Sequence, residues 1–250
     1  MNEAPGAEIQ WPIGPARPAL GDRNVDVWRI DLSRDDRQLQ RDARLLCEQE
    51  QDRARRFQFD VHRHRFVARR AALRVILGRY VGTAAQDLRF ETSGHGKPRL
   101  AGDATLQFNV SHSALMGLVA VARRREVGVD IESLDRDVKR ERLARRFFCA
   151  AEADAIEQYR DNDAVSAFFA CWTRKEAYVK ARGMGLAMGL ETFEVSVDLL
   201  EPATLLRTDD DPRNRDRWTM AHLVPGAGYL GALASGGRDI DLRLWHFTFI

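Results

Sequence analysis

Residues 115–132 of the chain read LMGLVAVARRREVGVDIE and contain two predicted strands joined by a charged turn. Residues 115–122 are apolar, and residues 123–126 are the polar stretch RRRE. In residues 127–132, side chains alternate with the period of two that places neighbours on opposite faces of a strand. We therefore expect two consecutive strands, and we place the division between two halves of the chain at the charged turn.

The elements predicted outward from this turn form two similar halves, without the regular alternation of a doubly wound fold. The predicted strands span residues 25–32, 88–92, 106–110, 115–122, 127–132, 193–197, 218–224, 228–234 and 241–249. The predicted helices span residues 35–60, 61–80, 138–160 and 164–182. This order favours an α+β fold of two pseudo-equivalent lobes. The predicted organisation is an extended N-terminal arm (1–24), an N-terminal lobe (25–126) and a C-terminal lobe (127–250).

The composition is typical of a soluble globular protein and excludes several classes of function. The chain has 250 residues, of which 44% are hydrophobic and 30% are charged. A formal net charge of +2 argues against a strong nucleic-acid partner. No apolar run reaches the ~20 residues of a membrane span, and the N-terminus lacks the pattern of a secretory signal. The widely separated cysteines, Cys47, Cys149 and Cys171, predict neither a zinc site nor disulfides, which favours a cytoplasmic location.

Two carboxylates share one face of the predicted strand over residues 127–132. Asp130 and Glu132 are two positions apart, while Val129 and Ile131 form the opposite, apolar face that anchors the strand. Paired carboxylates on a rigid strand suit Mg²⁺, which prefers oxygen ligands. A solvated strand face has the same spacing, so the pattern alone leaves both interpretations open.

The predicted helix over residues 164–182 carries Glu176 and Lys180 one turn apart. The ordinary explanation is an ion pair on a helix surface, which stabilises by about 0.2–0.5 kcal/mol. However, the apolar run over residues 164–171 and Trp172 indicate a largely buried helix. Charged side chains are rare on such a helix unless they have a function.

Two short motifs add residue types that bind phosphate. FNVSHS, residues 108–113, places Ser111 and His112 at the end of a strand. Adjacent residues of an extended chain point apart, so His112 is not expected to activate Ser111, and a structural histidine remains an alternative. GHGKP, residues 94–98, lacks the spacing of a phosphate-binding P-loop, although such a turn can direct Lys97 at an anion.

Lysine is scarce among the 39 basic residues, and its positions are informative. A compact ammonium group differs from a planar guanidinium, so a site that needs a point charge would retain lysine. Lys97, Lys175 and Lys180 fall within the motifs described above, and Lys139 does not. Together, the carboxylates, the cations and the histidine fit transfer chemistry on a phosphate or pyrophosphate ester.

In chain order, these motifs resemble those of the two-lobed 4′-phosphopantetheinyl transferases that activate surfactin-like synthetases. The matching segments are RRFQFDVHRHR (55–65), GKP (96–98), FNVSHS (108–113), GVDIE (128–132), FF…E (147–152) and WTRKEAYVKARGMGL (172–186). The resemblance implies two α+β lobes with coenzyme A bound in the cleft between them. It also implies Mg²⁺-dependent transfer of the 4′-phosphopantetheine arm to a serine of an acyl or peptidyl carrier protein, with release of 3′,5′-ADP.

The resemblance further implies roles for the matching acidic and catalytic residues. Asp130, Glu132 and Glu176 match the metal positions, and Glu176 also matches the proposed general base. Lys180 matches a cation that holds the pyrophosphate. The implied catalytic set is Glu176, Lys180, Asp130 and His112. Glu152 matches a further acidic position whose role is left open.

Contacts with coenzyme A are implied for a larger set of residues. His112 and Ser111 match phosphate contacts, and Lys97 matches a contact on the nucleotide side. Cationic positions around the ribose 3′-phosphate align with the N-terminal half, where Glu50 replaces a basic residue of the family pattern. The full set of implied coenzyme A contacts is Arg53, His64, Arg65, Lys97, Pro98, Ser111, His112, Lys175 and Lys180.

Two other functions would use all or part of the same residue set. A Mg²⁺-dependent phosphoesterase acting on coenzyme A or nucleotides would need a positioned water molecule instead of a carrier protein. A noncatalytic module would bind coenzyme A or a carrier without needing Glu176 and Lys180. The two-lobed type can form its site within one chain, so we expect a monomer with no nucleic-acid or membrane partner.

Overall fold

A computed structural model of the protein describes residues 10–92, 94, 96–185, 188–210 and 212–249. Residues 1–9 of the predicted N-terminal arm lie outside the described residues. The remainder of the arm lies against the body of the protein rather than extending away from it. Trp11 is buried and its indole nitrogen donates to the carbonyl of Val224 (3.0 Å), while Ile13 forms a parallel bridge with His246.

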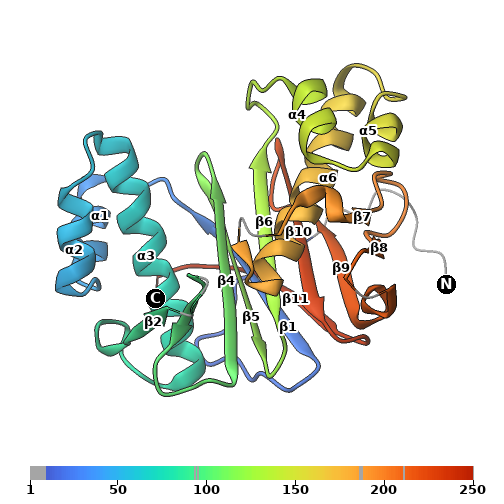
Figure 1. Ribbon diagram of the computed structural model, residues 1–250. Helices are drawn as coiled ribbons and strands as arrows, with labels where there is room; N and C mark the ends of the chain where they lie inside the picture. The colour runs from blue at the N-terminus through green and yellow to red at the C-terminus, as the bar shows by residue number, and fades with distance from the viewer. Residues whose placement is uncertain (1–9, 93, 95, 186–187, 211, 250) are drawn as a thin grey trace.

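Two β-sheets form the middle of the molecule (Figure 1). The first has the strand order β11-β1-β5-β4, in which β1 runs parallel to β11 and antiparallel to β5. The second has the order β6-β10-β9 and is antiparallel. Their strands are β1 (Asn24–Asp31), β4 (Leu106–Ser113), β5 (Met116–Arg123), β6 (Val127–Ser133), β9 (Trp218–Leu223), β10 (Tyr229–Gly236) and β11 (Asp241–His246).

In the described part of the chain, two small sheets and six α-helices surround these strands. The small sheets pair β2 (Phe90–Thr92) with β3 (Pro98–Leu100) and β7 (Phe193–Val195) with β8 (Leu205–Thr208). The α-helices are α1 (Asp36–Ala43), α2 (Glu48–Arg55), α3 (Asp60–Val81), α4 (Arg140–Phe147), α5 (Ala150–Ile156) and α6 (Asp161–Arg182). No helix among the described residues is long and apolar enough to cross a membrane.

The long helix α3 covers the outer face of the first sheet. Trp28 and Ile30 of β1 and Val119 of β5 are buried in one cluster with Leu73 and Leu77 of α3. Burying a side chain of this size contributes about 1.5–3 kcal/mol, so the apolar stripe of α3 fixes the helix on the sheet. Leu73 and Leu77 therefore lie on the face of α3 that packs against the sheet.

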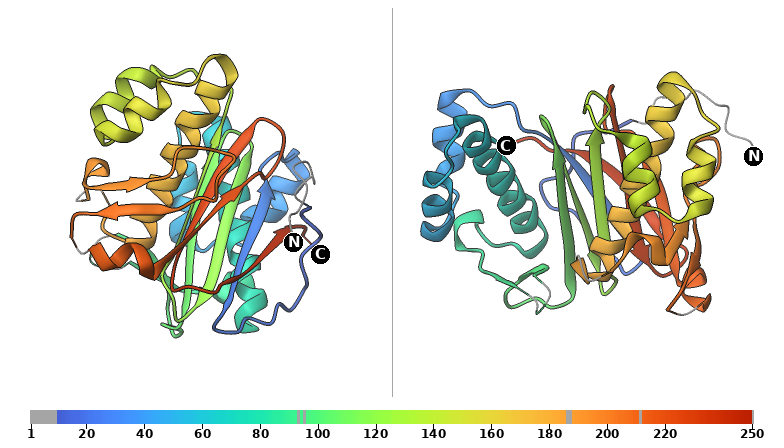
Figure 2. Two further views of the ribbon diagram at one scale, coloured as in Figure 1. Left: turned by 90° about the vertical axis from the view of Figure 1, so that its right-hand side faces the viewer. Right: turned by 45° about the horizontal axis from the view of Figure 1, so that its top comes forward.

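The two sheets pack against each other, and α6 covers the outer face of the second sheet. Leu118 from the first sheet and Val129 and Ile131 from the second lie in one buried cluster. Ala232 of β10 lies in another buried cluster with Phe168 of α6. The resulting order of layers is α3, first sheet, second sheet and α6, which agrees with two further views (Figure 2).

Gly128 allows α6 to approach β6 closely. A Cβ atom at this position would lie 2.1 Å from the carbonyl oxygen of Ala177 and 2.3 Å from the backbone nitrogen of Ala181. Any side chain at residue 128 would therefore push α6 away from the strand. The helix ends at Gly183, whose left-handed backbone (φ +66°) terminates helices without steric cost. Polar side chains of β6 and of the last turns of α6 are consequently brought together.

The structure confirms the predicted α+β fold with two sheet-and-helix layers. The predicted strand over residues 241–249 has an unexpected partner, because β11 pairs with β1 in the first sheet. The buried carboxylate of Asp26 in β1 accepts hydrogen bonds from Arg243 of β11 (2.6 and 3.0 Å). The lobe division at residues 126 and 127 falls between β5 and β6, but β11 shows that chain order alone does not assign strands to lobes.

Candidate active site

Three carboxylates meet where β6 faces α6. Asp130 and Glu132 extend from one face of β6 and are buried, with 4% and 9% of their surface exposed. Burial raises the pKa of Glu176 on α6, and the neighbouring carboxylates of Asp130 and Glu132 contribute to the rise. Lys180 opposes that rise. The three acids are therefore close enough to influence one another electrostatically, although they come from distant parts of the chain.

Lys180 connects this cluster to the first sheet. Its ammonium nitrogen lies 2.6 Å from Oδ1 of Asp130 and 3.0 Å from the hydroxyl oxygen of Ser111 on β4. The Ser111 hydroxyl in turn donates to Oδ1 of Asp130 (2.7 Å). Each of these three side chains contacts the other two, and the group joins β4, β6 and α6.

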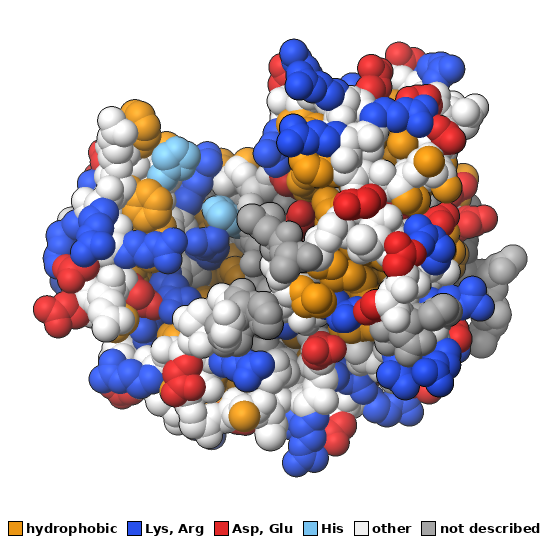
Figure 3. All heavy atoms as spheres, in the orientation of Figure 1, with side chains coloured by type: hydrophobic (Ala, Val, Ile, Leu, Met, Phe, Trp, Pro, Cys, Tyr) orange, Lys and Arg blue, Asp and Glu red, His pale blue; other side chains and the backbone are white. Residues whose placement is uncertain are grey.

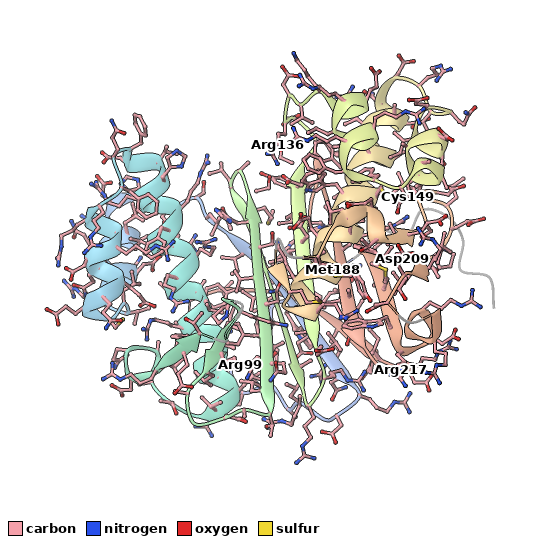
Figure 4. The ribbon with its side chains drawn as sticks, in the orientation of Figure 1. Arg99, Arg136, Cys149, Met188, Asp209 and Arg217 are labelled. Carbon is pink, nitrogen blue, oxygen red and sulfur yellow. The ribbon has the colours of Figure 1, made fainter. Side chains whose placement is uncertain are left out.

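Glu132 is held from two sides. Its Oε2 accepts a hydrogen bond from the hydroxyl of Ser113 at the end of β4 (2.8 Å). Its Oε1 accepts one from Arg136 (2.7 Å), which follows β6 on the loop toward α4 (Figure 4). The Arg136 side chain is 53% exposed, so this ion pair lies at the surface end of the cluster.

The donor set of the cluster fits a hard divalent cation. Carboxylate oxygens are the ligands that Mg²⁺ prefers. Oδ2 of Asp130 is buried and has no hydrogen-bond partner among the described residues, which makes it an available ligand atom. No set of three or more His, Cys, Asp or Glu side chains in the described part of the chain is already drawn together as a metal cage. The chemistry therefore fits Mg²⁺, while Lys180 occupies the other oxygen of Asp130.

His112 lies beside a pair of arginines from α3. Nη1 of Arg69 lies 2.8 Å from Nδ1 of His112. Desolvation, followed by the charges of Arg69, Lys180 and Arg65, lowers the pKa of His112 to about 4. The ring is therefore neutral at pH 7. Because a guanidinium group only donates, Nδ1 accepts and the ring proton lies on Nε2.

A cavity of about 930 Å³ lies between α2, α3 and the β2–β3 hairpin. Arg53, Arg69 and Arg70 line it together with Phe66 and Pro98. Figure 3 shows basic side chains gathered over this part of the molecule, beside the notch between the side that carries α1–α3 and the side that carries α4 and α5. The predicted contacts Arg53 and Pro98 thus lie in one cationic cavity, and Arg69 joins it to His112.

Glu50, which replaces a basic residue of the family pattern, lines this cavity. Its buried carboxylate accepts hydrogen bonds from Arg70 and from Nε of Arg74 (2.7 Å). Arg74 also donates hydrogen bonds to two backbone carbonyls. Glu50 therefore fixes the orientation of both arginine side chains. The acid at residue 50 thereby arranges two neighbouring cations instead of supplying one.

Lys97 lies on the other side of the β2–β3 hairpin from Pro98. Its ammonium nitrogen donates to the carbonyls of Val127 on β6 and Ala181 on α6, both at 3.0 Å. Burial lowers the pKa of Lys97 to about 8. The residue lines a second cavity, of about 530 Å³, with Arg99 and Arg182. Lys97 thus ties the hairpin to β6 and α6, and its contact with the nucleotide stays a prediction.

The structure does not bring Lys175 to the cluster, contrary to the expectation from the sequence. Its side chain is fully buried and lies 2.7 Å from Oε2 of Glu152. It also donates to the carbonyls of Leu190 (2.7 Å) and Phe193 (2.6 Å). Glu152 accepts a further hydrogen bond from the backbone of Val195 (2.8 Å). This pair joins α5 and α6 to β7 inside the core. Lys175 therefore faces the core, whereas the next residue, Glu176, faces Asp130 and Glu132.

His64 also lies apart from the arginine-lined cavity. It lines a shallow groove between α1, α2 and α3 with Leu39 and Val67. Successive residues of a helix are rotated by ~100°, so His64 and Arg65 face different directions. Arg65 faces His112 and contributes to lowering the pKa of that ring. Its Nε is buried without a hydrogen-bond partner among the described residues.

Three residues of the site were not predicted from the sequence. Arg69 could have been found, because it lies one helical turn after Arg65. Ser113 ends the FNVSHS motif on the same face of β4 as Ser111. Arg136 has no sequence signal, since its role depends on the path of the loop that follows β6.

Two family models match separate parts of the chain. Residues 126–234 match the family model described as the 4′-phosphopantetheinyl transferase superfamily, and residues 33–124 match the model described as 4′-phosphopantetheinyl transferase, N-terminal. The chain is 37% identical over 240 residues to 4′-phosphopantetheinyl transferase HetI of Nostoc sp., covering 95% of this chain and 98% of that protein.

Two further relatives are more distant. 4′-Phosphopantetheinyl transferase Sfp of Bacillus subtilis is 27% identical over 151 residues, covering 60% of this chain and 66% of that protein. The crystal structure of holo-[acyl-carrier-protein] synthase from Thermotoga maritima aligns with 45% of this chain and 62% of its own, with 19% identity and a TM-score of 0.36, too low to support an argument. The identity to HetI over nearly the whole length of both proteins is sufficient: this chain belongs to the 4′-phosphopantetheinyl transferase family.

Proposed function

We propose that this transferase moves the 4′-phosphopantetheine arm of coenzyme A onto a serine of an acyl or peptidyl carrier protein, with Mg²⁺, and releases 3′,5′-ADP. Membership of the family establishes the class of enzyme, with coenzyme A and carrier proteins as its substrates. The observation that carries the residue assignment is the ion pair of Lys180 with Asp130 where β4, β6 and α6 meet, with Glu176 within electrostatic range of Asp130 and Glu132. The phosphoesterase alternative gains no support, since HetI and Sfp are both 4′-phosphopantetheinyl transferases.

The arginine-lined cavity is the proposed site for the nucleotide end of coenzyme A. Its volume of about 930 Å³ suits a ligand of this size, because small-molecule sites span about 300–1,000 Å³. Arg53 and Arg69 supply cations for phosphate oxygens, and guanidinium groups bind such oxygens in pairs. Phe66 and Pro98 supply flat apolar surface for a base.

Neutral His112 is proposed to donate its Nε2 proton to a phosphate oxygen. Its Nδ1 is already occupied by Arg69, which fixes the tautomer that leaves Nε2–H available. Ser111 is engaged with Asp130 and Lys180, so its hydroxyl is oriented before substrate binds.

Asp130, Glu132 and Glu176 would hold the Mg²⁺ ion. When bound, the ion supplies positive charge that polarises the pyrophosphate of coenzyme A. The support is the oxygen-only donor set and the buried, unpartnered Oδ2 of Asp130 in the described part of the chain.

Glu176 and Lys180 are proposed to handle the proton and the leaving group. The serine hydroxyl of the carrier attacks the β-phosphorus, and Glu176 accepts its proton, directly or through water. A raised pKa makes a carboxylate a better proton acceptor, and burial and Asp130 raise that of Glu176. The bond from phosphorus to the leaving phosphate oxygen breaks, and Lys180 stabilises the charge that develops on 3′,5′-ADP.

We further propose that the enzyme acts as a monomer in the cytoplasm, without nucleic-acid or membrane partners. Both sheets of one chain supply residues to the site, which supports a monomer. The free thiols of Cys47, Cys149 and Cys171 are compatible with a reducing compartment.

Intact-mass spectrometry of an apo carrier protein tests this proposal. The carrier is incubated with the enzyme, coenzyme A and Mg²⁺, and a parallel reaction contains EDTA. We expect a mass gain of one phosphopantetheinyl group that is absent with EDTA. Hydrolysis of coenzyme A without modification of acyl or peptidyl carriers would overturn the proposal.

A further inference from the structure

Side chains of β4, rather than a backbone ladder, connect the two sheets. β4 and β6 lie side by side but belong to different sheets (Figure 1). Alternate residues of β4 bridge the junction. Oδ1 of Asn109 accepts a hydrogen bond from the backbone nitrogen of Val129 (2.9 Å). The hydroxyl oxygen of Ser113 accepts one from the backbone nitrogen of Ser133 (3.0 Å). Ser111 bonds to Asp130 at the intervening position.

The hydroxyl of Ser113 makes two different contacts with β6. It accepts from the backbone nitrogen of Ser133 and donates to Oε2 of Glu132 (2.8 Å). A hydroxyl has one proton to donate, so the first contact orients the oxygen and leaves the proton for the carboxylate. The hydrogen bond to Glu132 is therefore directed by the backbone of the same strand that carries Glu132.

Glu132 cannot rotate freely between these contacts and Arg136. Oε2 is held by Ser113 from the first sheet, and Oε1 by Arg136 from its own loop. The Arg136 side chain is half exposed, and exposed ion pairs fix geometry weakly. Glu132 is mostly buried, and the contact through Ser113 is the more protected of the two. The orientation of this carboxylate therefore depends mainly on Ser113.

We propose that Ser113 is a positioning residue that sets the orientation of Glu132 for metal binding and thereby couples the first sheet to the metal site. The inference rests on the proposed function, in which Glu132 is a metal ligand. Ser113 touches neither substrate nor metal in this scheme. It acts through the carboxylate, as outer partners of metal ligands generally do.

The test measures metal binding directly as well as transfer. Full-length wild-type protein and the variants Ser113→Ala, Ser113→Cys and Ser113→Thr are titrated with Mn²⁺ in the presence of coenzyme A, and free Mn²⁺ is followed by electron paramagnetic resonance. Mn²⁺ shares the preference of Mg²⁺ for oxygen ligands. Mg²⁺ dependence of transfer is measured on the same samples.

We expect Ser113→Ala to weaken Mn²⁺ binding by about tenfold to a hundredfold. Saturating Mg²⁺ should restore most of its transfer rate, which a general loss of structure would not allow. Ser113→Thr retains the hydroxyl and should bind Mn²⁺ like the wild type. Ser113→Cys has nearly the volume of serine but a weak donor, so it should resemble Ser113→Ala even if the alanine variant fails to fold.

Ser235→Ala is the matched control. Ser235 is a fully buried serine on β10, and its hydroxyl contacts the carbonyl of Gly236 (3.4 Å) instead of an acid. Wild-type Mn²⁺ affinity in the alanine and cysteine variants of residue 113, or equal losses in the alanine and threonine variants, would overturn the inference. A wild-type protein that does not modify carriers would instead overturn the proposed function, so the two failures are distinguishable.

Discussion

The ammonium group of Lys180 and the carboxylate of Asp130 are joined at a single oxygen. Lys180 lies 2.6 Å from Oδ1, whereas Oδ2 is buried and has no hydrogen-bond partner among the described residues. The hydroxyl of Ser111 also donates a hydrogen bond to Oδ1. Oδ1 is therefore held by two partners, while Oδ2 is available to a ligand. An unpartnered buried carboxylate oxygen is costly, and a cation is the partner that would satisfy it.

Replacing Asp130 with asparagine should abolish the use of this open oxygen. We expect Asp130→Asn to lower Mg²⁺-dependent transfer by about tenfold to a hundredfold, because the amide is a poor ligand and leaves Lys180 without its anion. Carrier modification is followed by mass spectrometry over a range of Mg²⁺ concentrations. Asp154→Asn, at an exposed residue paired with Arg145, is the control. Normal Mg²⁺ dependence in Asp130→Asn would remove Asp130 from the metal site.

Glu176 is expected to act on the proton and not on coenzyme A binding. Glu176→Gln should lower the transfer rate by about 10²–10⁴-fold, the usual contribution of a general base. The affinity for coenzyme A, measured by calorimetry, should stay close to that of the wild type. The control Glu157→Gln changes an exposed acid on α5's C-terminal side. Parallel loss of coenzyme A affinity and turnover would argue against a role as the base.

The charge of Arg69 should be visible in the titration of His112. Arg69→Gln removes one of the cations that lower the pKa of His112 to about 4, so the pKa should rise toward 6.5, with desolvation still opposing it. The loss of this cation should also weaken coenzyme A binding by about tenfold. NMR titration of the imidazole and calorimetry measure the two effects. Arg63→Gln, an exposed α3 change, should alter neither.

The Lys175–Glu152 pair is expected to matter for stability and not for transfer. Lys175→Met leaves the carboxylate of Glu152 buried without its cation, which costs about 3–5 kcal/mol of unfolding free energy. Denaturant unfolding measures this loss, and Lys139→Met at an exposed lysine supplies the comparison. Transfer per folded molecule should be unchanged. A stable Lys175→Met protein with impaired coenzyme A binding would restore Lys175 to the site.

A half-buried histidine outside the site, His222, should make stability depend on pH. Desolvation, and then the charge of Arg174, lowers the pKa of His222 to about 4, and its Nδ1 has no hydrogen-bond partner among the residues described. Below pH 6.5, His222 becomes protonated in the unfolded chain, whereas in the folded protein it stays neutral until the pH approaches 4. Unfolding free energy should therefore fall as the pH falls across this window, by up to about 3 kcal/mol.

Denaturant unfolding at a series of pH values measures the slope for His222. His222→Gln lacks the titrating ring and should lose that part of the slope. His112 has a similarly lowered pKa and contributes its own part, so the double variant should be flatter still. An identical slope in wild type and His222→Gln would show that folding does not lower the pKa of His222.

The sequence predicted the elements well because their patterns are local. The alternation in residues 127–132 placed Asp130 and Glu132 on one face of β6, as the structure shows. The residues that the structure placed elsewhere are those whose direction depends on packing. His64 differs from Arg65 by one helical step, and Lys175 differs from Glu176 in the same way. A motif shows that such neighbours occur together but not which of them faces a cavity.

Although it missed β3 and β8, the sequence by itself determined the family, the order of most strands and helices, and the acidic residues available for metal binding. Periodicity and motif order fix these because they depend on residues close together in the chain. Only the tertiary structure decided that β4 meets β6 through side chains, that Lys97 bonds to backbone carbonyls of β6 and α6, and that Lys175 is buried with Glu152. Those contacts join segments far apart in sequence. They depend on how closely the layers approach, which Gly128 permits at the junction of α6 and β6.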